Sequence, residues 1–356
     1  MPGNVFGSFF KVMTWGESHG KAVGAVIDGC PPGIALSGAD IQALLDRRRP
    51  GKGPASTQRA ESDTVQILSG LFEGLTTGTP ISLLIPNKDA KPGSYEAFSR
   101  LYRPGHGDFS YAKKYGIRDW RGGGRASARE TAARVAAAGV AKKLLESRNI
   151  SVFSYTVEMG GIVASERDMA QAAQNPFACP DVAAAGRIAQ RVEEVKREGD
   201  SIGGIVEVVA TGVLPGLGEP VFDKLDAKIA YALMGIGAVK GVEMGAGFAA
   251  ARLTGSTNND PITPEGFSSN NSGGILAGIS SGQDIVARVA VKPIPSISMQ
   301  QNTVTVDNEP TTLSVTGRHD VCAIPRINVV CEAMLMLVLA DALLAQQALG
   351  VGGWSA

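Results

Sequence analysis

The sequence predicts an α+β protein, in which strands and helices alternate along one globular chain. Segments with apolar residues at alternating positions, such as 152–157, are typical of strands. An alanine-rich stretch after residue 127 and a nearly all-apolar stretch from about 328 to 349 are long enough to form buried helices. Glycine supplies 45 of the 356 residues, above the usual share of about 7%, which indicates many tight turns.

The first half of the chain predicts two short strands on either side of a loop at 16–20, and the second of them ends at a Pro31-Pro32-Gly33 turn. Ser37 is expected to cap a helix through 38–49. A strand at 81–85 follows, and then a loop with a short helix at 86–102. Ser127 and Glu130 stand in the S-x-x-E relation of a capping box, which predicts a helix from 127 to about 147.

The second half predicts a strand at 152–157, charged helical stretches at 166–174 and 182–198, a strand at 202–213 and an amphipathic helix that ends at Gly235. The polar segment 254–274 exceeds the usual connection length, so we expect it to be either disordered or a functional lid. Strands at 275–279 and 284–291, a hairpin of 303–306 with 312–316, and a helix over 328–349 complete the chain. We expect residues 1–350 to form a single domain and residues 351–356 a disordered tail.

Composition excludes several classes of protein. Basic and acidic residues number 34 each, so net charge gives no support to a nucleic-acid or membrane partner. The four cysteines show neither zinc spacing nor a disulfide framework, which predicts a reduced, cytoplasmic protein without a metal site. The N-terminus lacks the pattern of a signal peptide, and the longest apolar run, 333–340, is too short to span a bilayer.

The segment 103–138 is predicted to bind an anion. A Gly122-Gly123-Gly124 turn directly precedes the expected helix, and Arg121, Arg125 and Arg129 add positive charge at its N-terminal end. This pattern favours a phosphate or phosphate-like ligand over the alternative of an ordinary capped helix after a flexible loop. The basic triplet 47–49 leaves two alternatives open, a ligand role and simple complementation of a helix dipole.

All three histidines lie in glycine-rich or charged loops, GESHG, RPGHGD and GRHD. Such loops expose the ring, which favours general acid or base work for His19 and His106 over a place in the core. The histidines are far apart in the sequence, so metal binding is less favoured.

Asp341 interrupts an apolar helix, and a buried carboxylate needs either a partner or a raised pKa. Glu332 lies on the opposite side of that helix and cannot pair with it. A structural ion pair with an arginine and a functional role both remain open.

Two short motifs are weak support for any function. Residues 16–20 fit the G-x-S-x-G elbow of serine hydrolases, with Ser18 as nucleophile, but a strand and not a helix is predicted after it. GAGFAA at Gly245 resembles a dinucleotide-binding turn without the acidic residue that should follow it.

The motifs GESHG, RRRPG, RPGHGD, RGGGRASARET, GDSIGG, LGEPVFDKLDA, SGGILAGISSG, KPIPSI and GRHD, in this order, resemble those of the chorismate synthases over essentially the whole chain. The resemblance implies a 1,4-anti elimination of phosphate from 5-enolpyruvylshikimate 3-phosphate, which requires reduced FMN and leads to the aromatic amino acids. It also implies a homotetramer whose subunit has a helical layer between antiparallel sheets.

The resemblance assigns roles to particular residues. His106, Arg48 and Arg129 would supply the proton and cations for the leaving phosphate, and His19, assisted by Ser18, would protonate the flavin. Asp341 would remove the substrate proton together with the flavin, and Ser127 is a further catalytic candidate. Arg48, Arg49, Arg129 and Arg326 would bind the phosphate of the substrate or of NADPH, a candidate reductant. The flavin contacts would be Arg125, Ala126, Ser127, Gly237, Ala238, Ala277, Lys292, Pro293, Ile294, Pro295, Ser296 and Arg318.

Four positions depart from the family pattern: Pro54, Gly237, Asn271 and Ala277. We expect these departures to affect flavin or nicotinamide binding and to leave the acid, base and phosphate groups in place. The rival hypotheses are a serine hydrolase, which a fluorophosphonate would label at Ser18, and a non-enzymatic polyanion-binding protein, whose affinity would fall steeply with salt.

Overall fold

The computed structural model describes residues 3–49, 53, 55, 61–88, 96, 98–315 and 320–350. Its first sheet has the order β1-β2-β3-β7-β4, with every neighbouring pair antiparallel. The strands are β1 (Val5–Phe6), β2 (Lys11–Gly16), β3 (Ala22–Asp28), β7 (Ile81–Pro86) and β4 (Gln66–Ile67). Strand β7 buries Ile81, Leu83 and Ile85, because side chains alternate between the two faces of a strand. A small hairpin, β5 (Leu71–Phe72) with β6 (Leu75–Thr76), lies beside this sheet.

The second sheet has the order β11-β16-β10-β8-β9 and is also antiparallel throughout. It consists of β8 (Ser151–Met159), β9 (Ile162–Val163), β10 (Gly204–Thr211), β11 (Val239–Met244) and β16 (Ile285–Val291). Strand β16 buries every second residue from Ile285 to Val291, which gives this sheet one apolar face.

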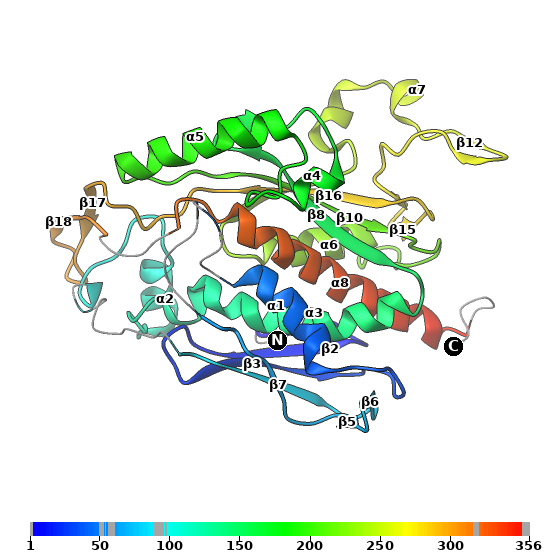
Figure 1. Ribbon diagram of the computed structural model, residues 1–356, viewed down its shortest axis with the longest axis horizontal. Coiled ribbons are helices and arrows are strands. Elements are labelled where there is room, and N and C mark those ends of the chain that lie inside the picture. The colour runs from blue at the N-terminus through cyan, green and yellow to red at the C-terminus, as the bar shows by residue number, and fades with distance from the viewer. Residues whose placement is uncertain are drawn as a thin grey trace.

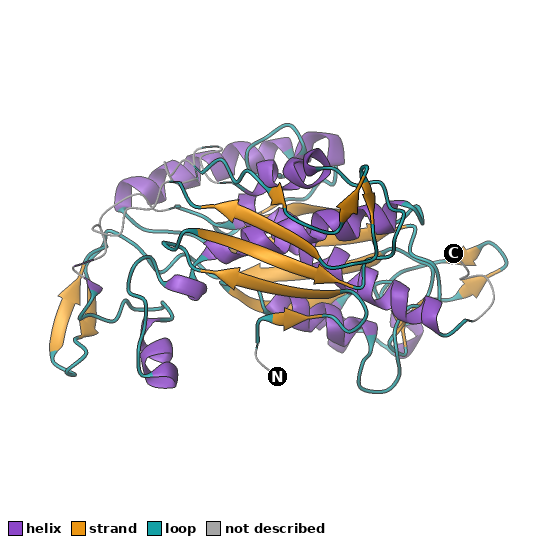
Figure 2. Ribbon diagram, turned by 90° about the horizontal axis from the view of Figure 1, so that it is seen from below, coloured by secondary structure: helices purple, strands orange, loops and turns teal. Residues whose placement is uncertain are grey.

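Four helices fill the space between the two sheets (Figure 1). They are α1 (Gly38–Arg48), α3 (Thr131–Glu146), α6 (Leu225–Met234) and α8 (Ile324–Ala348). Helix α3 packs against β3 and β7, whereas α8 packs against β8 and β10. Viewed from below, the first sheet shows a face that no helix of the described chain covers (Figure 2). The predicted α+β class and the helical layer between antiparallel sheets are confirmed.

Helix α8 is apolar on all sides because it is enclosed on all sides. By length and composition it is the one helix of the described chain that could cross a membrane, but 89% of its most apolar window is buried inside the fold. It therefore serves as the central core helix. It begins at Ile324, four residues before the predicted start, and Pro325 occupies its first turn, where a missing N–H is tolerated.

The remaining helices and turns surround this core. The helices are α2 (Asp108–Tyr115), α4 (Met169–Ala172), α5 (Val182–Glu198) and α7 (Gly255–Asn258), and the 3-10 turns are η2 (Gly124–Ala126), η3 (Ala128–Glu130) and η4 (Gly247–Arg252). Three hairpins complete the fold: β12 (Ile262–Thr263) with β13 (Gly266–Phe267), β14 (Ile275–Leu276) with β15 (Ile279–Ser280), and β17 (Gln301–Val304) with β18 (Pro310–Leu313).

Three local predictions are wrong. The expected strand at 275–279 is the hairpin of β14 and β15. The Ser127 hydroxyl accepts from the Arg129 N–H and not from the third helical amide, while Glu130 pairs with Arg134, so no capping box forms and α3 begins after a 3-10 turn. The polar segment 254–274 is neither disordered nor a lid over the cleft described below. It folds into α7 and a hairpin, because the Asp260 carboxylate accepts from the Ser269 hydroxyl and from the amides of Asn271 and Ser272. The predicted tail, 351–356, lies outside the described residues.

Candidate active site

The glycine turn at 122–124 separates two histidines. Gly122 and Gly123 have φ values of +63° and +86°, which favour glycine. A Cβ on Gly122 would lie 2.2 Å from Cε1 of His19, and a Cβ on Gly123 would lie 2.7 Å from Cε1 of His106. The two rings therefore pack directly against consecutive glycines, and each is half-buried. The sequence analysis singled out the glycine turn and the two histidines separately, and the structure shows that they are in contact.

A cleft of about 590 Å³ opens beside this turn, within the usual size of small-molecule sites. Its walls come from the 103–107 loop, the start of α3, the end of α6, the 292–296 segment and the first turns of α8. Two carboxylates, Asp320 and Glu130, line it, against six basic side chains: Arg48, Arg103, Arg125, Arg134, Lys292 and Arg326. The chain as a whole has no net charge, so this local excess of basic side chains favours the binding of an anionic ligand in the cleft.

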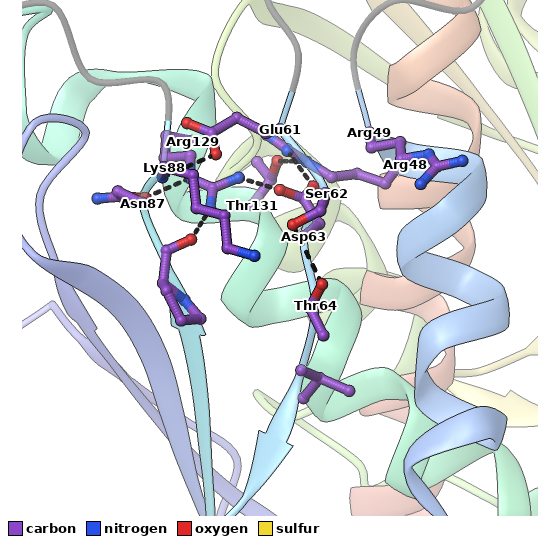
Figure 3. A network of polar contacts seen from close by, with 12 residues as sticks. Arg48, Arg49, Glu61, Ser62, Asp63, Thr64, Asn87, Lys88, Arg129 and Thr131 are labelled. Atoms are coloured by element: carbon purple, nitrogen blue, oxygen red, sulfur yellow. Dashed lines mark hydrogen bonds and ion pairs between the residues drawn. The ribbon is translucent and has the colours of Figure 1, made fainter.

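Arg48 and Arg129 meet at one buried carboxylate, Asp63 (Figure 3). The side chain of Asp63 is 0% exposed, and those of Arg48 and Arg129 are 3% and 2% exposed. Arg48 donates Nη1 to Asp63 at 2.9 Å, Nε to the Thr131 hydroxyl and Nη2 to the Ala128 carbonyl. Burial lowers the pKa of Arg48 below its ordinary value, and the nearby Asp63 opposes that shift.

Arg129 turns away from the cleft. Besides Asp63, its guanidinium donates to the Asn87 side chain at 2.7 Å and to the Pro86 carbonyl at 3.3 Å. It does not line the cleft, whereas Arg48 does. Arg48 is therefore in reach of a ligand in this cleft, whereas Arg129 is connected to the cleft through Asp63.

His106 belongs to a second buried cluster. Its Nδ1 lies 3.1 Å from Oδ1 of Asp108, and Arg103 donates Nε and Nη2 to the same carboxylate at 2.7 and 2.8 Å. Burial alone would raise the pKa of Asp108, but hydrogen bonds from Arg103 and His106 outweigh it and hold that pKa well below its usual range. Asp108 is therefore ionised at neutral pH.

The other basic side chains of the cleft differ in their partners. Arg134 pairs with Glu130, and Arg326 pairs with Asp320. Lys292 donates to the Gly105 carbonyl at 2.7 Å, and burial, followed by the nearby Lys240, lowers its pKa. Arg125 contacts Gly16, Thr14 and Asn4. Within the described chain, Lys292 and Arg125 thus donate to uncharged oxygens, which do not neutralise their charge.

Most predicted site residues line the cleft: Arg48, His106, Arg125, Ala126, Ser127, Gly237, Ala238, Lys292, Ile294, Pro295, Ser296 and Arg326. Others do not. His19 and Ser18 contact Gly122 but do not line the cleft. Arg49 pairs with Asp46 at the half-exposed end of α1. Pro293 is exposed and lies beside Gly203. Ala277 lies in the exposed turn between β14 and β15, away from this cleft. Arg318, His319 and Pro54 lie outside the described residues.

Asp341, the predicted acid of the apolar helix, lies outside the lining of this cleft. Its Oδ1 accepts three backbone N–H groups, from Ser8, Phe9 and Phe10, at 2.6 to 2.9 Å. It follows Val330, the last cleft residue of α8, by eleven positions, or about 16 Å at the rise of an α-helix. The carboxylate holds the N-terminal turn to the core, and within the described residues its hydrogen bonds are with backbone amides and not with an arginine, which was one of the two open alternatives.

Asp320 is the carboxylate that the sequence analysis missed. It is 9% exposed, lines the cleft and pairs with Arg326 across the start of α8. The GRHD motif had drawn attention only to its histidine. Arg103, Arg134 and Glu130 were also missed, because only the fold brings their segments to one cavity.

The serine hydrolase hypothesis fails on geometry. Ser18 lies in the turn of a β-hairpin between β2 and β3, and no helix follows it. Its side chain is 1% exposed, and its hydroxyl has no hydrogen-bond partner within the described chain. No group of three or more His, Cys, Asp or Glu residues that could hold a metal occurs in the described ranges.

Together, the fold and the basic cleft, which contains His106, are those of an α+β enzyme with a site for an anionic small molecule. The chorismate synthase family model matches residues 10–344. The chain is 66% identical over 346 residues to the chorismate synthase of Desulfatibacillum aliphaticivorans, covering 97% of each chain, and 63% identical over 350 residues to that of Desulfosudis oleivorans, covering 98% of this chain and 99% of the relative. A crystal structure of chorismate synthase has a TM-score of 0.77 at 36% identity, over 96% of this chain and 93% of that one.

The chain therefore belongs to the chorismate synthase family. It is a carbon–oxygen lyase of the shikimate pathway, which supplies the aromatic amino acids.

Proposed function

We propose that the cleft binds reduced FMN together with 5-enolpyruvylshikimate 3-phosphate and that His106, Arg48 and Asp320 carry out the 1,4-anti elimination of phosphate. The observation that carries the proposal is the cleft itself, in which six basic side chains surround a histidine that a buried carboxylate holds in place. Arginine guanidinium groups stabilise the charge that develops on a departing phosphate.

The residues present fit a flavin mononucleotide. Its phosphate requires cations whose charge is not already neutralised, and Lys292 and Arg125 are of this kind in the described cleft. Its planar ring requires apolar surface, which Ala126, Ala238 and Ile294 provide. When bound, reduced FMN supplies the electron-rich ring that the family chemistry requires.

His106 and Arg48 act on the leaving group. Arg48 is oriented by Asp63, Thr131 and Ala128, so it can bind phosphate without reorganising. His106 lines the same cleft and can donate a proton to the departing oxygen. Ser127 lines the cleft and caps the turn before α3, so we assign it a binding role near the same anion.

Asp320 takes the role that the resemblance gave to Asp341. It and Glu130 are the two carboxylates of the described cleft. Glu130 forms an i,i+4 pair with Arg134 at the start of α3, whereas Asp320 lies with Arg326 in the wall formed by α8. We therefore assign Asp320 as the acceptor of the substrate proton. His19, packed on Gly122, remains the candidate for exchanging a proton with the flavin.

We further propose a cytoplasmic homotetramer, with NADPH as a candidate reductant and residues 1–350 as its single domain. The outer face of the first sheet supports oligomerisation, because Met13 and Trp15 of β2 alternate with the buried Val12 and are 49% and 36% accessible. Sedimentation of the purified protein tests the assembly, and NADPH oxidation with added FMN tests the reductase activity.

The test of the chemistry is anaerobic. Purified protein is mixed with reduced FMN and 5-enolpyruvylshikimate 3-phosphate, and chorismate absorbance and free phosphate are followed together. We expect equal release of both products, none with oxidised FMN, and loss in His106→Ala and Asp320→Asn but not in Glu194→Gln on the exposed side of α5. Retained turnover in Asp320→Asn with loss in Glu130→Gln would reassign the base.

A further inference from the structure

The ring of His106 is held from behind by Asp108, two residues later in the chain. Asp108 is the first residue of α2, where the helix dipole favours a carboxylate. It is 2% exposed, and the His106 side chain is 14% exposed. The contact between Nδ1 and Oδ1, at 3.1 Å, is thus largely shielded from water.

Three cationic or potentially cationic groups share this carboxylate. Arg103 donates its backbone N–H and Nε to Oδ2 and its Nη2 to Oδ1, while Nη1 of Arg118 lies 3.1 Å from Oδ1. Arg118 in turn donates to the carbonyls of Phe98, Ser99 and Leu101, which fixes its position. Asp108 is therefore a rigid, ionised acceptor.

This arrangement selects the proton position on His106. An ionised carboxylate can only accept, so its contact with Nδ1 is a hydrogen bond only when Nδ1 carries a proton. Nη2 of Arg103 also lies 3.2 Å from Nδ1 and can only donate, so it would bond Nδ1 only if that nitrogen were bare. The contact of Nδ1 with the ionised carboxylate, at 3.1 Å, is the shorter of the two and would be a charge-assisted hydrogen bond, so the geometry favours the proton on Nδ1.

The opposite edge of the ring faces the glycine turn and the cleft. Nε2 would lie 3.1 Å from a Cβ on Gly123, so only glycine leaves room for it. The other charged or titratable groups around the ring, from every element packed near it, are Glu17, Tyr111, Asp119, Arg125 and Lys292. Within the described chain the hydrogen bonds of the ring are made at Nδ1, so Nε2 is the nitrogen that can reach a ligand.

We propose that Asp108 is a positioning residue that fixes His106 with Nδ1 protonated, so that Nε2 delivers its proton to the departing phosphate. The inference rests on the proposed function. As the C–O bond breaks, its electron pair goes to the phosphate oxygen, which takes the proton from Nε2 and leaves a neutral ring protonated on Nδ1. The new double bonds take their electrons from the C–H bond lost at the other end of the 1,4-elimination, so no oxidant is consumed.

The direct test is the ¹⁵N NMR spectrum of the ring nitrogens, which distinguishes a protonated from a bare nitrogen. The chain has only three histidines, so His106→Gln assigns the signals. We expect neutral His106 to carry its proton on Nδ1 in the wild type and to lose that preference in Asp108→Asn. A wild-type ring protonated on Nε2 overturns the proposal whether or not the protein is active.

Kinetics provide the second readout. Asp108→Asn should lower kcat on the order of 10²-fold, the usual weight of general acid catalysis, with a smaller change in KM, and should move the alkaline fall of kcat to lower pH. Asp108→Glu should restore part of kcat, and Asp307→Asn, an exposed carboxylate paired with Arg100, should behave as wild type. An equal loss in Asp108→Glu and Asp108→Asn, with the wild-type tautomer on Nε2, would mean that Asp108 is only structural.

The two hypotheses fail differently. Absence of turnover in the wild type with reduced FMN would overturn the proposed function, but the NMR spectrum would still show which nitrogen of His106 carries the proton. If Asp108→Asn does not fold, the wild-type tautomer and the Asp108→Glu profile still decide the positioning role.

Discussion

At the scale of single residues, burial and hydrogen bonding separate side chains that look alike in the sequence. Arg48 and Arg129 both belong to predicted anion-binding loops, and both contact Asp63. Only Arg48 lines the cleft: its other partners, Thr131 and Ala128, belong to the cleft wall, whereas Arg129 reaches Asn87 and Pro86, which do not line it. Residue type and spacing predict a cation in this region, but the direction of each guanidinium depends on its partners.

The corresponding prediction compares Arg48→Gln with Arg129→Gln. Each change leaves Asp63 with one ion-pair partner fewer, so both should lower the free energy of unfolding, by about 3–5 kcal/mol for a buried pair that loses one member. Only Arg48→Gln should raise KM for the substrate by tenfold or more, about 1.4 kcal/mol. Denaturant unfolding and initial rates measure the two effects, and equal increases in KM would show that Arg129 also contacts the phosphate.

At the scale of elements, the turn before α3 can hold two histidine rings because its glycines have no side chains. The rings of His19 and His106 occupy the positions that Cβ atoms on Gly122 and Gly123 would need, and both glycines have left-handed backbone conformations. The turn therefore places two rings against one short stretch of backbone, next to the N-terminal end of a helix.

We expect Gly123→Ala to displace His106 and to abolish most of kcat while the protein stays folded. Gly186→Ala is the matched control, since a Cβ at Gly186 meets nothing within 4 Å on the exposed side of α5. That change should raise stability by about 0.5–1 kcal/mol, because alanine favours helix over glycine. Thermal unfolding and turnover of both variants provide the measurements, and normal turnover in Gly123→Ala would remove the steric argument.

The polar segment around α7 and β12–β13 depends on one carboxylate. Burial raises the pKa of Asp260, but hydrogen bonds from Ser269, Ser272 and Asn271 outweigh it and lower that pKa to about 2. A carboxyl whose folded pKa is depressed stabilises the fold above its unfolded value, near 4. Its contribution is lost as the pH falls from about 4 towards 2.

We therefore expect the amide NMR signals of Asn271 and Ser272 to change between about pH 4 and pH 2, before those of the core strands. Asp260→Asn should show the loosened segment already at neutral pH, with β10 and β16 unaffected. Simultaneous loss of segment and core signals in the wild type would show that this carboxylate has no separate local role.

At the scale of the whole molecule, the central helix α8 joins distant parts of the chain. Glu332 forms two hydrogen bonds with Arg47 of α1 and a third with Ser154 of β8, and Asp341 binds the amides at 8–10. Both carboxylates can be buried in an apolar helix because groups from other elements form hydrogen bonds with them there.

Asp341→Asn tests this reading. The amide keeps the shape of the side chain but weakens three charge-assisted hydrogen bonds, so we expect a loss of about 1–3 kcal/mol in the free energy of unfolding. The turnover of the folded protein should change little, in contrast to Asp320→Asn. A large fall in kcat at unchanged stability would return Asp341 to the chemistry.

Most elements and the family can be predicted from the amino-acid sequence. Local patterns predict β2, β3, β7, α1, α5 and α6 near their observed bounds, and the ordered motifs identify the chorismate synthase family. Which charged groups meet depends on contacts between segments that are far apart in the chain. Asp63 lies 66 residues from Arg129, and Asp341 lies 332 residues from Phe9. The partners that surround a carboxylate are set by contacts that no local pattern specifies, so only the folded chain shows that Asp320 lines the cleft and that Asp341 lies outside its lining.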